Sequence, residues 1–191
     1  MSGIISIGTH PEPLVHQHTE IIMTIQLNSQ LPSGQLIECD EFDPTTGCAI
    51  NPKTIDPAVE AKAGCIVIFG VPGAFTPTCT QKHLPGFLAL EDQLKAKGVD
   101  QIWCLSVNDH FVMTAWGREQ KALGKIRMMA DGSATYSKAL GLDRDLTPNG
   151  MGVRCRRFAM IVQDGVITYL GVEESGQFGV STAEAVLAHL D

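Results

Sequence analysis

One cysteine stands where its sulfur could be made reactive. Segment 71–79 (VPGAFTPTC) follows an apolar run and contains the proline and glycine of a turn, so a strand is expected to end there and a helix to begin. Thr76 suits the N-cap of that helix, and Pro77 suits its first position because the N–H that proline lacks would be unpaired there. Cys79 then lies in the first turn, near free backbone N–H groups and the positive end of the helix dipole. Both features favour the thiolate, which is the nucleophilic form of cysteine.

The alternative for Cys79 is the state of most intracellular cysteines, a small apolar side chain packed in a core. Its place directly after a strand and a turn argues against that alternative. At 191 residues the chain can bury a core without disulfides, and it has no C-x-x-C pair. We therefore expect mostly buried thiols, with one or two reactive ones. The other cysteines are Cys39, Cys48, Cys65, Cys104 and Cys155.

Strands and helices alternate from residue 65 onward. Residues 65–69 (CIVIF) are typical of a strand buried on both faces, and the spacing of apolar side chains predicts a helix over 77–96. Asp109 is a candidate N-cap for a helix over 109–123. Further strands are expected at 99–107, 126–129, 157–163 and 166–172, the last two joined by the Asp164-Gly165 turn, with short helices at 133–140 and from a Ser181 cap to about residue 190. This order predicts an α/β protein with a central mixed β-sheet flanked by helices, as in a thioredoxin-like fold.

The N-terminal part has a different character. Residues 1–23 are polar and contain several histidines, and we expect them to form a flexible N-terminal extension. Residues 24–191 are then one thioredoxin-like domain. Turn-forming residues separate short apolar stretches over 21–65, which predicts an irregular hairpin region.

Charge and hydropathy exclude several classes of protein. The net charge of −7 argues against a nucleic-acid-binding face and against docking on an anionic membrane. No stretch approaches the roughly 18 apolar residues of a membrane span. Residues 1–22 contain neither Lys nor Arg, so a secretory or transit peptide is not expected. These features favour a cytoplasmic protein.

Several motifs together resemble the type II, peroxiredoxin-five-like subfamily of the peroxiredoxins. The segment 72–79 (PGAFTPTC), continued by 83–87 (HLPGF), looks like the peroxiredoxin active-site signature. Further matches, in the same order along the chain, are 104–109 (CLSVND), Trp116-Gly117, and 157–158 (RF) leading into 162–165 (VQDG). The resemblance covers roughly residues 24–190. It implies a thioredoxin-like fold and reduction of hydrogen peroxide and alkyl hydroperoxides, with no cofactor and no metal.

The resemblance also implies a role for individual residues. Cys79 would be the peroxidatic cysteine, whose thiolate attacks the peroxide and becomes a sulfenic acid. Thr76 would place its hydroxyl against the peroxide and the sulfur, and Pro72 would shield the sulfenic acid from solvent. Arg157 would approach from across the pocket, favour the thiolate and bind the peroxide oxygens. His83, four residues after Cys79, could tune the thiolate or only cap the pocket.

The choice of Arg157 rests on the resemblance alone. Three arginines stand within four residues, and any of them could be a solvated surface charge. Strand alternation is expected to place Arg154 and Arg156 on one face and Arg157 on the other.

The reduction of the sulfenic acid admits two schemes. Cys104 matches a cysteine assigned as the resolving partner in plant-type members, but at the end of a buried strand it could equally be an ordinary core thiol. Segment 177–181 has no cysteine where animal-type members carry their resolving one. A Cys79–Cys104 disulfide and a one-cysteine cycle therefore both stay open, with glutaredoxin and glutathione or thioredoxin as the reductant.

Other functions are less well supported by the sequence. Cys79 and His83 offer two metal ligands without a second pair, and a cysteine hydrolase would leave Arg157 without a role. A thioredoxin-like redox-sensing or interaction module without efficient peroxidase turnover is the non-enzymatic alternative. By analogy with the family we expect a homodimer formed through the active-site loop and residues 116–118 (WGR).

Overall fold

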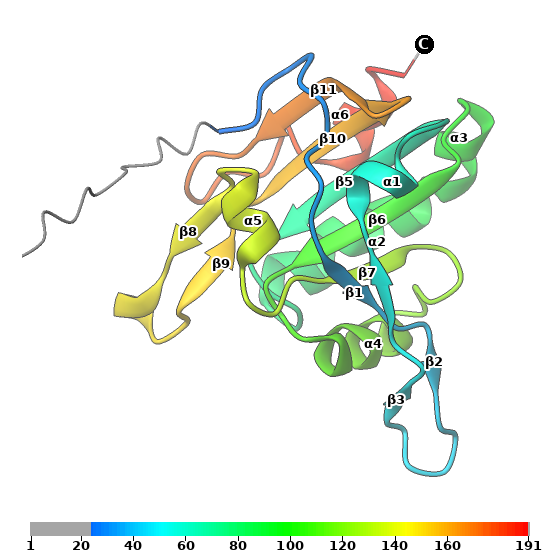
Figure 1. Cartoon of the computed structure of the whole chain (residues 1–191), viewed down its shortest axis with the longest axis vertical. Helices are drawn as coiled ribbons and strands as arrows, with labels where there is room; N and C mark the ends of the chain where they lie inside the picture. Colours follow the sequence, from blue (N-terminus) through cyan, green and yellow to red (C-terminus); the bar gives the residue numbers. More distant parts are fainter. Residues whose placement is uncertain (1–23, 191) are drawn as a thin grey trace, which may run out of the picture.

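The computed structural model describes residues 24–190 (Figure 1). The strands are β1 (Leu36–Glu38), β2 (Glu41–Phe42), β3 (Ala49–Ile50), β4 (Lys53–Ile55), β5 (Cys65–Val71), β6 (Gln101–Ser106), β7 (Arg127–Ala130), β8 (Asp143–Asp145), β9 (Val153–Cys155), β10 (Phe158–Gln163) and β11 (Val166–Val172). The helices are α1 (Pro57–Glu60), the π-helix η1 (Cys79–His83), α2 (Leu84–Ala89), α3 (Glu91–Ala96), α4 (His110–Glu119), α5 (Thr135–Ala139), the 3₁₀-helix η2 (Thr147–Asn149) and α6 (Ala183–Leu187). The expected flexible extension over 1–23 lies outside the described residues.

A mixed seven-stranded sheet organises the domain in the order β11-β10-β5-β6-β7-β1-β4. Strand β5 is buried along its whole length and pairs in parallel with β6 and antiparallel with β10. Its continuous apolar sequence is what a central strand covered on both faces requires. The thioredoxin-like fold with a central mixed sheet is thereby confirmed.

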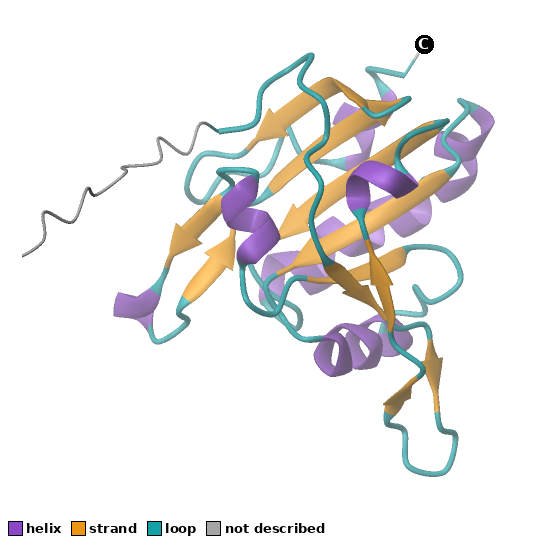
Figure 2. Ribbon diagram, viewed as in Figure 1, coloured by secondary structure: helices purple, strands orange, loops and turns teal. Residues whose placement is uncertain are grey.

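Helices cover both faces of this sheet (Figure 2). One apolar cluster joins alternate residues of β5, such as Phe69, to Phe87 of α2, Trp116 of α4 and Val186 of α6. The other cluster joins the intervening β5 residues, such as Ile68, to the side that carries α1 and α5. Because side chains alternate along a strand, one seven-residue segment supplies both cores. None of the helices within residues 24–190 has both the length and the apolar character needed to cross a bilayer.

Three expectations about local structure are corrected. The predicted continuous helix over 77–96 is a chain of three elements, η1, α2 and α3, with a break at Leu90. The cap of α6 is Thr182, whose hydroxyl accepts the Ala185 N–H at 3.1 Å, and not Ser181. The antiparallel β8–β9 hairpin was not expected from the sequence, because β8 is entirely polar (Asp-Arg-Asp) and each strand has only three residues.

Candidate active site

The turn before Cys79 has the geometry that the sequence predicts. The helix starts at Pro77, and the Thr80 N–H closes its first turn on the Thr76 carbonyl at 2.9 Å. Phe75 adopts the left-handed region with φ of 61°, which reverses the chain between β5 and the helix. The Asn108 side chain accepts the Ala74 N–H at 3.0 Å and so fixes this loop to the end of β6. Cys79 is thus held in the first turn of a helix.

That turn widens into the π-helix η1, in which the Leu84 N–H bonds to the Cys79 carbonyl. Pro85 gives a physical reason for the widening. Its ring would clash with the carbonyl four residues earlier in a regular α-helix, and the proline has no N–H to bond it. Single π-turns inside helices are frequent at functional sites. Here the turn carries Cys79 at one end and His83 at the other, and both side chains reach the same arginine.

Cys79 is fully buried, and its sulfur faces a cation. The Arg157 guanidinium places Nη2 3.4 Å from Sγ, a distance that suits a hydrogen bond to sulfur. The structure therefore brings together these two residues, which are 78 positions apart in the sequence. A guanidinium at this distance stabilises a thiolate in surroundings that otherwise disfavour charge.

Thr76 and Pro72 are placed differently. The Thr76 hydroxyl donates to the Gly73 carbonyl at 2.8 Å, and a contact with Sγ is not among the hydrogen bonds of residues 24–190. Its proton is used within the turn, so the hydroxyl offers its lone pairs to an incoming donor. Pro72 is half-buried and lines a cleft together with Arg157.

His83 contacts the outer nitrogen of Arg157 that does not face the sulfur. Its Nε2 lies 2.8 Å from the Ser181 carbonyl oxygen, and its Nδ1 lies 3.0 Å from Arg157 Nη1. A carbonyl only accepts and a guanidinium only donates, so Nε2 carries the proton and Nδ1 accepts from Arg157. Burial, reinforced by the Arg157 charge, lowers the pKa of His83 to about 3. The imidazole is therefore neutral at physiological pH and serves as an acceptor for Arg157.

A buried carboxylate fixes the loop that carries Ser181. Glu173 Oε1 accepts hydrogen bonds from Gly179 N at 2.6 Å, Ser181 N at 2.8 Å and Ser181 Oγ at 2.8 Å. Burial raises the pKa of the Glu173 carboxyl, but these donors outweigh it and hold the pKa below its ordinary value. The loop also brings Phe178 edge-on to His83, with ring centroids 5.2 Å apart. An ionised Glu173 therefore anchors the loop against which His83 and Arg157 are positioned.

The three neighbouring arginines do not follow the expected strand alternation. Strand β9 ends at Cys155 and β10 begins at Phe158, so Arg156 and Arg157 lie in the link between strands. Both face the same cleft. Arg154 instead donates to the Met151 and Val107 carbonyls at 2.7 and 3.3 Å. The prediction that Arg156 lies with Arg154 on the face away from Arg157 is wrong, because Arg156 and Arg157 lie between β9 and β10 and not within one continuous strand.

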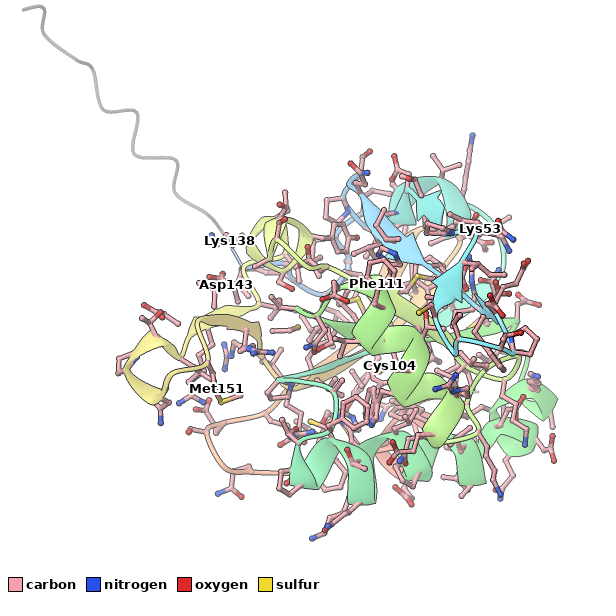
Figure 3. All side chains as sticks on the ribbon, turned by 90° about the horizontal axis from the view of Figure 1, so that it is seen from below. Lys53, Cys104, Phe111, Lys138, Asp143 and Met151 are labelled. Carbon is pink, nitrogen blue, oxygen red and sulfur yellow. The ribbon has the colours of Figure 1, made fainter. Side chains whose placement is uncertain are left out.

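Cys104 lies in β6, fully buried in the same apolar cluster as Cys79. Figure 3 shows it in the middle of the molecule, away from the hairpin that carries Asp143 and Met151. Burial raises the pKa of the Cys104 thiol well above its ordinary value. Burial also raises the pKa of Cys155 to about 12. Among residues 24–190, no group of three or more His, Cys, Asp or Glu side chains is placed to hold a metal ion.

No pattern in the sequence indicated that Glu173 and Ser181 belong to the site. Ser181 was expected to be a helix cap, and Glu173 follows the last strand without any motif around it. A signal did exist for the π-turn, since Pro85 stands inside the predicted helix at a position where a regular helix cannot hold it.

Known proteins share this arrangement of elements. The Redoxin family profile matches residues 26–187. Peroxiredoxin-2C of Oryza sativa subsp. japonica is 43% identical over 166 residues, which cover 87% of this chain and 98% of the relative. A crystal structure of reduced Prx3 from Vibrio vulnificus in complex with H₂O₂ is 45% identical with a TM-score of 0.76, covering 88% of this chain and 100% of that one. Peroxiredoxin 5 of Alvinella pompejana is 30% identical with a TM-score of 0.72, covering 87% and 97%.

Proposed function

Because the chain belongs to the Redoxin family and is a type II peroxiredoxin, a thiol-dependent peroxidase, we propose that Cys79 is its peroxidatic cysteine and Arg157 its activating cation. One observation carries the assignment: Sγ of Cys79 lies in the first turn of a helix with Arg157 Nη2 at 3.4 Å. Hydrogen peroxide and alkyl hydroperoxides are the proposed substrates.

In the proposed reaction the Cys79 thiolate attacks the terminal oxygen of the hydroperoxide. A sulfur–oxygen bond forms and the O–O bond breaks, which oxidises the sulfur to a sulfenic acid. The leaving oxygen carries away the electron pair of the O–O bond and takes up a proton, giving water or an alcohol. Negative charge grows on that oxygen, so donors already aimed at it supply most of the rate enhancement.

Arg157 is suited to this role because its two outer nitrogens are already oriented. Nη1 is held by His83 while Nη2 faces the sulfur, so the guanidinium needs no rearrangement when the peroxide arrives. In the proposal, the Thr76 hydroxyl oxygen accepts a hydrogen bond from the hydroperoxide O–H while the Thr76 hydroxyl continues to donate to the Gly73 carbonyl. Pro72 covers the sulfenic acid from the side of the cleft.

For the reduction of the sulfenic acid we favour the one-cysteine cycle. A disulfide between Cys79 and Cys104 requires Cα atoms within about 7 Å and exposure of a residue from the middle of a buried strand. Burial keeps the Cys104 thiol protonated, so it attacks slowly. An external thiol supplied by glutathione with glutaredoxin, or by thioredoxin, avoids both requirements. The Cys79–Cys104 cycle is the second candidate, since both residues lie in one cluster.

Mass spectrometry after one equivalent of peroxide separates these two cycles. The one-cysteine cycle leaves a sulfenic acid on Cys79 in both the wild type and Cys104→Ser, and a dimedone adduct identifies it. A loss of two hydrogens from the wild type, absent in Cys104→Ser, would establish the internal disulfide instead.

A homodimer is the proposed assembly. Trp116 and Gly117, which were expected at the interface, are buried within the monomer, where Trp116 Nε1 donates to Thr80 Oγ1 at 3.2 Å. The exposed apolar side chains nearby support a neighbouring surface instead: Phe75 in the active-site loop and Phe111 in the first turn of α4 are about half exposed. We expect Phe75→Glu to shift the protein from dimer to monomer in light scattering. An unchanged mass would contradict this surface.

Stopped-flow oxidation separates a peroxidase from the redox-sensing alternative. Rapid loss of the thiolate with turnover in the presence of a thiol supports the enzyme, and slow oxidation without turnover supports a sensor. A cytoplasmic location stays a prediction from the sequence, and subcellular fractionation would test it.

A further inference from the structure

A cleft of about 540 Å³ opens beside the reactive sulfur. Its lining comes from the β8–β9 hairpin, the loop after β11 and the start of the active-site helix. The lining also includes Pro72 and Arg157, and Arg157 is the residue whose Nη2 contacts Cys79 Sγ. The volume lies in the range of small-molecule sites. A ligand in this cleft is therefore one side chain away from the sulfur.

Three cations from three separate elements line this cleft in addition to Arg157. They are Lys82 of η1, Arg144 of β8 and Arg156 of the β9–β10 link. Arg144 Nη2 donates to Ser175 Oγ at 3.2 Å, and Arg156 Nη2 donates to the Glu173 carbonyl at 3.3 Å. In the described part of the chain none of the three forms an ion pair, although the protein has a net charge of −7.

The acidic side chains of the lining do not cancel these cations. Glu173 is buried, and its Oε1 accepts hydrogen bonds from Gly179 and Ser181, not from the three cations. Asp143 and Glu174 remain, and neither contacts one of the cations within ion-pair distance among residues 24–190. With Arg157 included, four cations and three carboxylates line the cleft, which leaves a formal excess of one positive charge. Lys82, Arg144 and Arg156 also keep N–H donors that are not used in ion pairs within residues 24–190.

We propose that this cleft binds a small thiol bearing carboxylates, a chemical class that includes glutathione, and presents its sulfur to oxidised Cys79. The inference rests on the proposed role of Cys79, because a thiol-dependent peroxidase must admit a thiol to the sulfur it oxidises. Lys82, Arg144 and Arg156 bind the carboxylates through charge-assisted hydrogen bonds. The thiol end of the ligand lies toward Arg157.

Reduction of the sulfenic acid in the cleft takes two thiol molecules in succession. The sulfur of the small thiol attacks the sulfur of the Cys79 sulfenic acid, an S–S bond forms, and the S–O bond breaks. The thiol proton leaves with the hydroxyl group as water. A second molecule of thiol then attacks the mixed disulfide, which restores Cys79 and releases the oxidised small disulfide.

The test measures how fast preformed sulfenic acid is reduced, in the Cys104→Ser background so that no internal disulfide forms. The probes are glutathione, its diethyl ester, which lacks both carboxylates, and dithiothreitol, which is uncharged. We expect Arg144→Gln and Arg156→Gln each to lower the ratio of the glutathione rate to the dithiothreitol rate about 3- to 10-fold. In the Cys104→Ser protein with both arginines present, we also expect the ratio of the glutathione rate to the ester rate to fall with added salt. Lys62→Gln, an exposed cation outside the cleft, is the matched control and should leave the ratio unchanged.

Two outcomes would overturn the proposal. Equal rates with glutathione and its ester, in the wild type and in both variants, would show that the cations do not bind carboxylates. If Arg144→Gln and Arg156→Gln instead slowed the oxidation of Cys79 by a fatty-acid hydroperoxide and left reduction by glutathione unaffected, the cleft would be assigned to the peroxide. If peroxide forms no sulfenic acid on Cys79 at all, the proposed function fails first, and the dimedone adduct reports that result separately.

Discussion

Cys79 and Cys104 are equally inaccessible to solvent, yet their thiols have different surroundings. Both are fully buried, and both belong to the apolar cluster between the sheet and the active-site helix. Cys79 lies in the first turn of a helix and faces a guanidinium at 3.4 Å. Cys104 lies in the centre of a strand, and burial raises its pKa without an opposing cation. Burial alone therefore does not decide whether a thiol reacts; the charges buried with it do.

The most direct way to break this comparison is to remove each sulfur in turn. We expect Cys79→Ser to abolish peroxide reduction completely. Cys104→Ser should retain the rate of the peroxide step within about twofold, since that sulfur faces no activating group. Stopped-flow peroxide consumption measures both. If Cys104→Ser lost the peroxide step while Cys79→Ser kept it, the two roles would be reversed.

Removing the cation should make Cys79 resemble Cys104. We expect Arg157→Ala to lower the second-order rate constant with hydrogen peroxide about 10²- to 10³-fold, the usual loss when a preorganised donor is removed. Arg157→Lys keeps the charge but cannot bond the sulfur and His83 together, so it should recover only part of the rate. Circular dichroism checks the fold. Full activity in Arg157→Ala would remove the proposed basis of the comparison.

The third prediction concerns His83 and the free energy of unfolding at acid pH. Its pKa is about 3 in the folded protein and about 6.5 when unfolded, so the unfolded chain binds more protons between these values. Stability must then fall as the pH drops below about 6.5. Between pH 7 and pH 5 the free energy of unfolding should fall by about 2 kcal/mol more in the wild type than in His83→Gln. Urea unfolding at both pH values measures this difference.

His189→Gln is the matched control for that measurement, because His189 is exposed in the turn that follows α6. Its pH dependence of stability should follow that of the wild type. If His83→Gln also followed the wild type, His83 would not be buried in its neutral form.

The smallest expected effect comes from the loop anchor. Glu173→Gln keeps the shape of the side chain but exchanges charge-assisted hydrogen bonds for weaker neutral ones. Ser181 and His83 are then held less firmly against Arg157, and we expect about a fivefold lower rate with peroxide. Glu174→Gln, one residue further along and exposed, is the control and should keep the rate. Equal rates in the two variants would show that Glu173 has no positioning role.

The sequence predicted those parts of the site that lie within one continuous segment. Residues 71–79 contain the strand end, the turn and the helix start, so local preferences place Cys79 correctly. The apolar runs and the Asp164-Gly165 turn also predicted a mixed sheet with a hairpin at that turn, although not the order of its strands. Residues distant in sequence were found only through the family resemblance, as with Arg157.

The position of Glu173 shows why the remainder could not be predicted. Counting back from the two-residue turn pairs Gln163 with Val166 and would set Arg157 opposite Val172. An irregularity between Ile161 and Val162 shifts the register by one residue. Phe158 therefore pairs with Val172, and the Glu173 N–H donates to the Arg157 carbonyl at 2.9 Å. No local pattern in the sequence marks that bulge, and a shift of one residue changes which side chain lies beside the arginine.

Gly70, in the central strand β5, affects the active site through its packing against β10. It pairs with Phe158, and a Cβ atom there would overlap the Phe158 ring and come within 2.9 Å of the Cys155 sulfur. Those two residues bracket the link that carries Arg157. We therefore expect a methyl group at residue 70 to shift this link, and the Arg157 guanidinium with it, without contacting any reacting atom. A change in sheet packing is therefore expected to lower peroxidase activity. A survey of variants confined to the pocket would not include residue 70.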